Sequence, residues 1–86
     1  KARRLSVVQP RVTSTLLRQA PATVVVIFIV DENGRVQDPK VQRTTNPSFD
    51  RSALAAIKQW KFEPAKVQGR SVSSRLRQSF SFENNT

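Results

Sequence analysis

An apolar run that leads directly into a tight turn is the feature that most constrains the fold of this chain. The run Val24–Val30 reads VVVIFIV, and the turn Asp31–Gly34 reads DENG. β-Branched and aromatic residues favour strands, and an Asn-Gly pair tolerates the positive φ angles of a hairpin turn. The pattern predicts a β-hairpin whose return strand is Arg35–Gln42. A bulge near Asp38-Pro39 would place both valines of the return strand on the core face.

Both faces of the first predicted strand are apolar. Side chains alternate between the faces of a strand, so the two sets are Val24, Val26, Phe28 and Val30, and Val25, Ile27 and Ile29. A sheet covered by a helix on one side normally alternates apolar with polar residues. We therefore expect a cover on the second face as well, either the N-terminal segment or another chain.

An amphipathic helix is predicted after the hairpin. Asn46 is a suitable N-cap, and Pro47 suits the first helical position. Apolar residues then recur at helical spacing from Phe49 to Trp60. We interpret Trp60 and Phe62 as core residues rather than as residues that stack on a ligand.

The remaining segments complete a small α+β domain. A turn at Gln68-Gly69 precedes an alternating third strand, Arg70–Phe82. Near the other end, Pro10 opens a short helix that Pro21 ends. We predict an (α)ββαβ fold, a three-stranded antiparallel sheet with a helix packed on one face. The predicted structural core is Val24, Val26, Phe28, Val30, Gly34, Phe49, Leu54, Ile57, Trp60, Phe62 and Phe80.

Length and composition restrict the number of domains and the classes of function that the chain can have. The 86 residues suffice for one domain, divided here into a basic, irregular tail (1–9) and a folded part (10–86). The chain begins at Lys1 without methionine or a signal peptide, so we expect a C-terminal fragment of a longer protein. It contains no His, Cys or Tyr, and its acids have no metal-loop spacing. We therefore predict no catalytic residue, no metal and no cofactor: the protein is not an enzyme.

A net charge of +9 favours acidic partners. Nucleic acid is one alternative, because sheet-based RNA-binding domains stack bases on exposed aromatic residues. Here the aromatic residues of the strands, Phe28, Phe80 and Phe82, are assigned to the core face. No nucleic-acid partner is expected for this reason.

Six short motifs, in order, resemble the C-terminal domain of TonB-type energy transducers. They are V-x-F-x-V at Val26–Val30, D-x-N-G-R-V at Asp31–Val36, P-x-F-D at Pro47–Asp50, A-L-x-A at Ala53–Ala56, Q-W-K-F-x-P at Gln59–Pro64 and F-x-F at Phe80–Phe82. The tryptophan motif is the most specific of them.

The resemblance implies a periplasmic domain of a protein anchored in the inner membrane of a Gram-negative bacterium. Such a domain binds the TonB box of outer-membrane transporters by β-strand augmentation. It transmits proton-motive energy from an inner-membrane proton-channel complex for active uptake, for example of iron chelates or haem. An envelope scaffold domain of similar fold, not coupled to transport, is the alternative. Both a monomer and a dimer are compatible with the sequence.

The resemblance places the partner-binding residues on the last strand and around the start of the first predicted helix. They are Ser71, Val72, Ser73, Ser74, Arg75, Leu76, Arg77 and Gln78, together with Gln9, Pro10 and Arg11. The sequence departs from the family pattern at Val12-Thr13, where a Tyr-Pro pair is usual. Arg11 is the remaining candidate there for a polar contact with the transporter.

Overall fold

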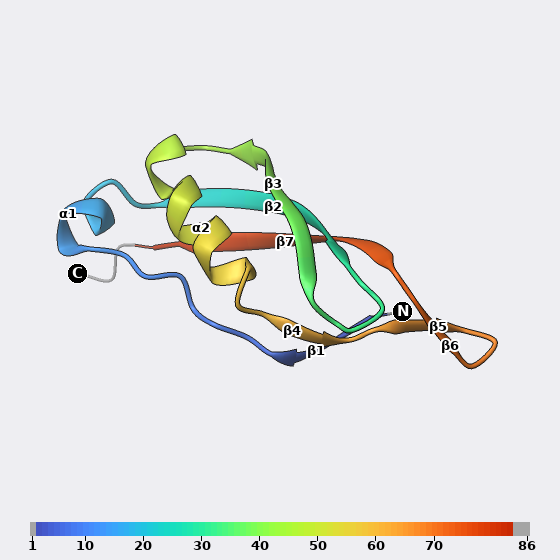
Figure 1. Ribbon diagram of the computed structural model, residues 1–86. Coiled ribbons are helices and arrows are strands. Elements are labelled where there is room, and N and C mark those ends of the chain that lie inside the picture. Colours follow the sequence, from blue (N-terminus) through green and yellow to red (C-terminus); the bar gives the residue numbers. More distant parts are fainter. Residues whose placement is uncertain (1, 84–86) are drawn as a thin grey trace.

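The structure is a computed structural model and describes residues 2–83. The described elements, in chain order, are β1 (Arg3–Ser6), α1 (Ser14–Leu17), β2 (Ala22–Val30), β3 (Val36–Thr44), the 3-10 turn η1 (Pro47–Phe49), α2 (Asp50–Ile57), β4 (Lys61–Glu63), β5 (Ala65–Val67), β6 (Arg70–Val72) and β7 (Ser74–Phe82). Figure 1 shows the three long strands side by side under α2, with the β5–β6 hairpin projecting at one end.

The central sheet is antiparallel, with strand order β3-β2-β7. The helix α2 packs on one face of this sheet, so the predicted α+β fold is confirmed. Two short pairs, β1–β4 and β5–β6, lie outside the central sheet. Neither pair was predicted.

Strand β2 is the centre of the core because its alternate residues are all buried on one face of the sheet. Val24, Val26 and Val30 are fully buried, and the buried ring of Phe28 lies 5.6 Å from that of Phe62 in β4. The other set, Val25, Ile27 and Ile29, is half-buried on the opposite face. The N-terminal segment packs against the core cluster through residues such as Val8, Val12 and Leu16. Within residues 2–83 it is therefore not the expected cover of the second face.

Asp31 organises the turn between β2 and β3. Its Oδ1 accepts hydrogen bonds from the backbone N–H groups of Asn33 and Arg35, each at 2.9 Å. Its Oδ2 accepts a third from Nε2 of Gln37, also at 2.9 Å. The side-chain bond from Gln37, followed by the backbone bonds, lowers the pKa of the Asp31 carboxyl because all of them favour its ionised form.

Gly34 closes this turn and fixes it to β4. Its φ is +80°, and a Cβ at this position would overlap the carbonyl oxygen of Phe62. The carbonyl of Gly34 also accepts a hydrogen bond from the Phe62 N–H at 2.9 Å. The hairpin turn and β4 thus approach so closely that glycine is required for space as well as for its backbone angles.

The predicted bulge in the return strand is present. The pairing of β3 with β2 shifts between Ile27 and Ile29, opposite Asp38 and Pro39, and Asp38 has a φ of 51°. Val36 and Val41 both pack against the core as a result. A second shift, between Val25 and Val26, was not predicted.

The predicted N-cap begins the helical segment. Oδ1 of Asn46 accepts a hydrogen bond from the Ser48 N–H at 3.0 Å, and Pro47 occupies the first position of η1. The helix α2 then buries Ala53, Ala56 and Ile57 against the sheet. Leu54 is half-buried at the margin of the core.

Aromatic rings join the helix end to the strands. Trp60 meets Phe80 edge-on with ring centroids 5.6 Å apart, and Phe49 lies 4.7 Å from Phe82. Trp60 is 6 % exposed and Phe62 is 5 % exposed, which confirms their interpretation as core residues. The indole Nε1 of Trp60 also donates a hydrogen bond to the Val8 carbonyl at 2.9 Å and so holds the N-terminal segment in place.

The sequence-based predictions differ from the structure in three further places. The tail 1–9 is not irregular throughout, because Arg3–Ser6 form β1 and pair with β4. The first helix begins at Ser14 rather than Pro10, since the Thr13 side chain caps it by accepting from the Leu16 N–H at 3.0 Å. The single strand predicted at Arg70–Phe82 is divided at Ser73 into β6 and β7.

Candidate functional site

Strand β7 is a long, regular edge of the central sheet. It pairs with β2 through consecutive residues from Ser74↔Val30 to Phe82↔Ala22, without a register shift. No described residue pairs with its other side. In an antiparallel strand, every second residue directs its N–H and C=O away from the paired neighbour. This side of β7 therefore presents a row of backbone donors and acceptors available to an extended chain.

The opposite edge, β3, is much less regular. Its pairing with β2 shifts twice, Asp38 has a positive φ, and Pro39 has no N–H to donate. Bulges and proline are devices that prevent a strand edge from pairing with another chain. Of the two outer strands of the central sheet, β7 is the one with a regular edge and no described partner on its outer side.

A groove of about 380 Å³ runs beside the C-terminal half of β7. The N-terminal segment forms one wall with Gln9, Pro10 and Val12, and the strand residues from Gln78 to Phe82 form the other. The hydrogen bond from Trp60 to Val8 holds the N-terminal wall in place. The guanidinium of Arg4 adds to this, because it lies 5.9 Å from the centre of the Trp60 ring. The structure thus brings together Gln9, Pro10 and Gln78, which are far apart in the sequence.

The side chains of β7 give its two faces different chemistry. Leu76 and Gln78 are half-buried and line a hollow on the core side, together with Arg3 and Arg4 of β1. Arg75 and Arg77 are exposed on the opposite face. The edge is therefore flanked by cations on both sides.

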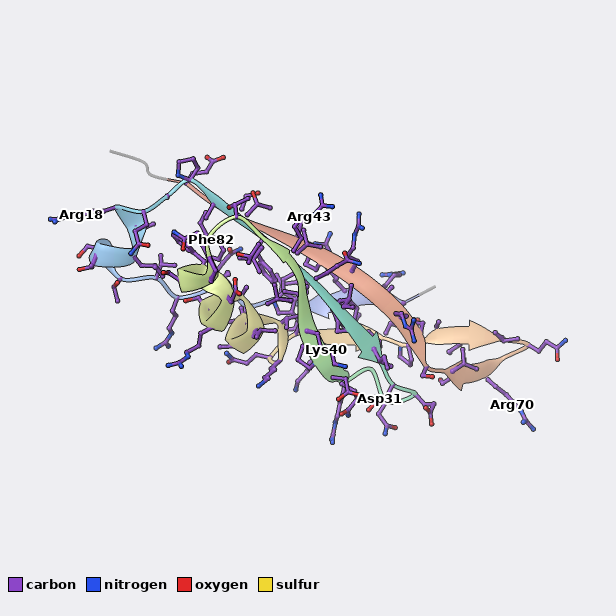
Figure 2. The ribbon with its side chains drawn as sticks, turned by 90° about the horizontal axis from the view of Figure 1, so that it is seen from above. Arg18, Asp31, Lys40, Arg43, Arg70 and Phe82 are labelled. Carbon is purple, nitrogen blue, oxygen red and sulfur yellow. The ribbon has the colours of Figure 1, made fainter. Side chains whose placement is uncertain are left out.

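Basic side chains extend from Arg18 at one end of the molecule to Arg70 at the other (Figure 2). Within residues 2–83 the structure contains a single ion pair, between Nε of Arg3 and Oε2 of Glu63 at 3.9 Å, and both side chains are exposed. This one pair occupies one of the 15 Lys and Arg side chains of the chain. The positive charge of the molecule remains available to acidic partners.

Not all predicted site residues lie at the β7 edge. Ser71 and Val72 belong to β6 and pair with Lys66 and Ala65 of β5, and Ser73 lies at the break between the two strands. These three residues therefore lie outside β7, and their role in partner binding stays a prediction. Arg11 lines a separate hollow beside α2, with Arg51 and Gln59 among its other residues.

The groove also contains residues that were not predicted. Ser79, Ser81 and Phe82 line it from β7, and Val7 and Val12 line it from the N-terminal segment. The alternation of the last strand continues to Phe82, so this signal could have extended the predicted edge. Nothing in the sequence indicated that the N-terminal segment would lie beside that strand.

Among residues 2–83, no three His, Cys, Asp or Glu side chains gather closely enough to hold a metal ion. In the same range, no helix combines the length and apolar character that crossing a membrane would require.

Comparison with known proteins identifies relatives of the whole fold. The family model for the Gram-negative bacterial TonB protein C-terminal matches residues 16–83. "Protein TonB" from each of two strains of Xanthomonas campestris pv. campestris is 35% identical over 60 residues, which is 69% of this chain and 27% of the relative. The chain thus spans 27% of the length of these curated relatives. The solution NMR structure of the Pseudomonas aeruginosa TonB CTD matches with a TM-score of 0.78 and 25% identity, covering 99% of this chain and 88% of that one.

Proposed function

Because the chain belongs to the Gram-negative bacterial TonB C-terminal family, we propose that it is the transporter-binding domain of an energy transducer. In this proposal the domain works in the periplasm, and the complete protein is anchored in the inner membrane. An inner-membrane proton-channel complex supplies the energy through parts of the protein outside this sequence. The partners are outer-membrane transporters, and the outcome is active uptake, for example of iron chelates or haem.

The observation that carries the proposal is the unpaired, regular edge of β7. An extended transporter segment, the TonB box, would add to the sheet as a further strand beside Ser74–Phe82. Main-chain hydrogen bonds supply affinity in this mode and require little of the sequence that binds. Each bond is worth roughly 0.5–1.5 kcal/mol net, so a row of them gives binding that is useful and still reversible. One domain could therefore serve several transporters.

The groove beside β7 would supply selectivity. Side chains of an added strand alternate between two faces, so those on the core side would enter the groove lined by Gln9, Pro10 and Gln78. Those on the other face would lie next to Arg75 and Arg77, which favour acidic neighbours. Arg11, beside α2, would contact a part of the transporter outside the added strand.

The same geometry suits the transfer of force. A pull along paired strands loads the inter-strand hydrogen bonds together rather than one after another. The loaded strand β7 is itself paired with β2 along its full length, and β2 is the most deeply buried strand of the sheet. A force on the bound segment is thereby carried into the core of the domain.

An NMR titration of the ¹⁵N-labelled chain with peptides from transporter N-termini tests the proposal. Amide shifts are expected along Ser74–Phe82 and in the groove, at Gln9, Val12 and Gln78. Peptides with a scrambled sequence serve as the control for charge-driven binding, because the chain is strongly basic. Shifts concentrated on β3, or equal shifts with scrambled peptides, would contradict binding at the β7 edge.

A further inference from the structure

The sheet has a second apolar surface, on the face opposite α2. It consists of Val25, Ile27 and Ile29, the alternate residues of β2 that are half-buried. Within residues 2–83, α2 and the N-terminal segment pack on the other side, against the core cluster. Aliphatic side chains in the central strand of a sheet are normally covered. This stripe is therefore a surface suited to a partner.

Cations line both sides of the stripe. Paired residues in an antiparallel sheet point to the same face, so the register defines the neighbours. Arg75 and Arg77 of β7 are the partners of Ile29 and Ile27. On the other side, Lys40 and Arg43 of β3 are the partners of Ile27 and Val25. All four basic side chains are exposed, whereas the aliphatic side chains between them are half-buried.

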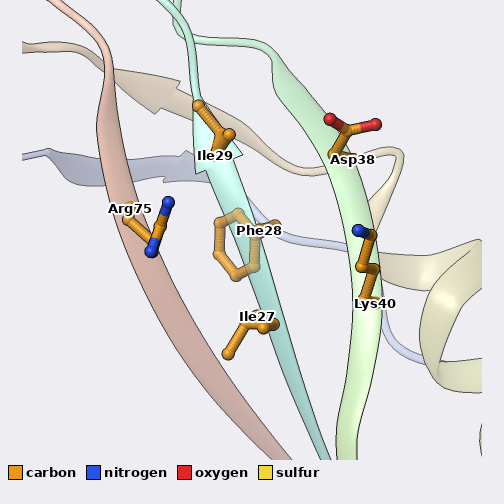
Figure 3. Close-up of a pocket in the computed structure, with 6 residues that line it drawn as sticks. All are labelled: Ile27, Phe28, Ile29, Asp38, Lys40 and Arg75. Carbon is orange, nitrogen blue, oxygen red and sulfur yellow. The ribbon is translucent and has the colours of Figure 1, made fainter.

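The accessible part of the stripe is a hollow of about 350 Å³ over Ile27 and Ile29. Figure 3 shows the two isoleucines between Arg75 on one side and Lys40 and Asp38 on the other. Nη1 of Arg77 reaches over β2 and donates to Oε1 of Gln42 at 3.4 Å, which closes off the Val25 end. Asp38 is the one acid that lines the hollow, so positive charge still dominates the rim.

These features restrict the class of occupant. The backbone of β2 is paired on both sides, so this face cannot accept an added strand. A second copy placed face to face would set one row of cations against another. A flat lipid surface would meet the exposed arginines and lysine first and leave the recessed isoleucines uncovered. A narrow, protruding segment with acidic flanks would contact both the recessed isoleucines and the basic side chains on either side of them.

The dimensions match an α-helix. Ile27 and Ile29 lie roughly 7 Å apart along the strand, close to the rise of about 6 Å between residues four apart in a helix. The two basic rows, on strands either side of β2, are roughly 10 Å apart, about the diameter of a helix. One helix could therefore seat two aliphatic residues on the floor and direct carboxylates at both rows.

We propose that the sheet face centred on Ile27 and Ile29 docks an acidic amphipathic helix of another protein. Two aliphatic side chains one turn apart cover the isoleucines, and flanking Glu or Asp residues pair with Arg75, Arg77 and Lys40. This site lies on a sheet face and not on the β7 edge. Arg75 and Arg77 border both sites, so a strand bound at the edge and a helix bound on the face would share these two cations.

The test uses a synthetic amphipathic peptide of about 18 residues, longer than the roughly 12–15 residues below which isolated helices are marginal in water. It carries leucines one turn apart with glutamates on both flanks, and a matched peptide has lysine in place of every glutamate. The full chain is titrated with each peptide and followed by NMR and calorimetry. Vesicles of phosphatidylcholine with phosphatidylglycerol are tested in parallel.

The diagnostic variant is Ile27→Thr with Ile29→Thr, which keeps β-branched residues in the strand. Val67→Thr, at a position that is 59% exposed on β5, is the matched control. The double variant should bind the glutamate peptide at least about tenfold more weakly, because apolar burial is lost. The control variant should bind it unchanged, and the spectra should show that both variants remain folded.

The outcomes separate the proposal from its alternatives. Shifts at Ile27, Ile29, Lys40 and Arg75 with the glutamate peptide, and no binding of the lysine peptide, support it. Equal binding of the two peptides, equal binding by the double variant, or shifts confined to the β7 groove would each overturn it. Binding to vesicles without binding to the glutamate peptide would also overturn it and identify a lipid surface as the occupant.

Discussion

Replacing Gly34 with alanine should destabilise the folded domain, for two separate structural reasons. The residue has a φ of +80°, which costs an alanine about 1–2 kcal/mol. The added Cβ would also overlap the Phe62 carbonyl oxygen, a backbone atom that cannot rotate away. The turn and β4 must then separate, which weakens the hydrogen bond between the Phe62 N–H and the Gly34 carbonyl, worth a further 0.5–1.5 kcal/mol or so. The total expected loss is about 1.5–3.5 kcal/mol.

Gly69 offers a matched control for this prediction. Its φ is +79°, nearly the same as that of Gly34, but a Cβ there would meet no atom within 4 Å. Gly69→Ala should therefore cost the backbone term alone, about 1–2 kcal/mol. Urea denaturation followed by tryptophan fluorescence measures both variants, since Trp60 is the sole tryptophan. Equal losses for the two variants would refute the reasoning, because the close approach to β4 would then contribute nothing.

Two further changes test the core and the turn. Trp60→Ala should lower the free energy of unfolding by about 3–5 kcal/mol, because the ring is buried and its Nε1 holds the N-terminal segment. Urea denaturation followed by circular dichroism measures this loss, and a stable variant that loses only peptide binding would show that Trp60 belongs to the interface. Asp31→Asn should lower the free energy of unfolding at neutral pH. The difference in this free energy between the variant and the unmodified chain should shrink as the pH falls below roughly 4. The pKa of the Asp31 carboxyl is lowered in the folded state, so the ionised carboxylate stabilises the fold. This contribution is complete above the pKa of the unfolded chain and is lost on acidification. A difference that stays constant from neutral pH to about pH 3 would contradict this role of the carboxylate.

The hairpin and the helix could be predicted because their signals are local. Three signals each fix the conformation of residues within a few positions of themselves: the apolar run Val24–Val30, the DENG turn and the Asn46-Pro47 cap. The apolar stripe from Phe49 to Trp60 then determines which face of the helix is buried. The bulge at Asp38-Pro39 followed from parity alone, because Val36 and Val41 can share a face only if one residue is inserted between them.

The N-terminal strand β1 could not be predicted by the same means. Its four residues, Arg3–Ser6, are all exposed and show no alternation. Its pairing with β4 depends on residues about sixty positions away, which are brought close by the Trp60 contacts. The position of Gln9 and Pro10 beside β7 has the same long-range origin.

The break at Ser73 follows from a local signal, the turn at Gln68-Gly69. Gln68 and Gly69 both have positive φ and form a two-residue turn, so the residues just after the turn must pair with those just before it. Arg70–Val72 are therefore committed to β5. The alternation of side chains continues through Ser73 with unchanged parity, which made the two strands look like one.

Backbone methylation of a bound peptide tests strand addition at β7 most directly. Two versions of a transporter N-terminal peptide would carry N-methyl groups on alternate residues, one version for each parity. Only every second N–H of an added strand faces its neighbour, so one methylated version should lose binding to the chain while the other keeps it. Equal binding by both versions, or equal loss in both, would contradict the addition of a strand to the free edge at Ser74–Phe82.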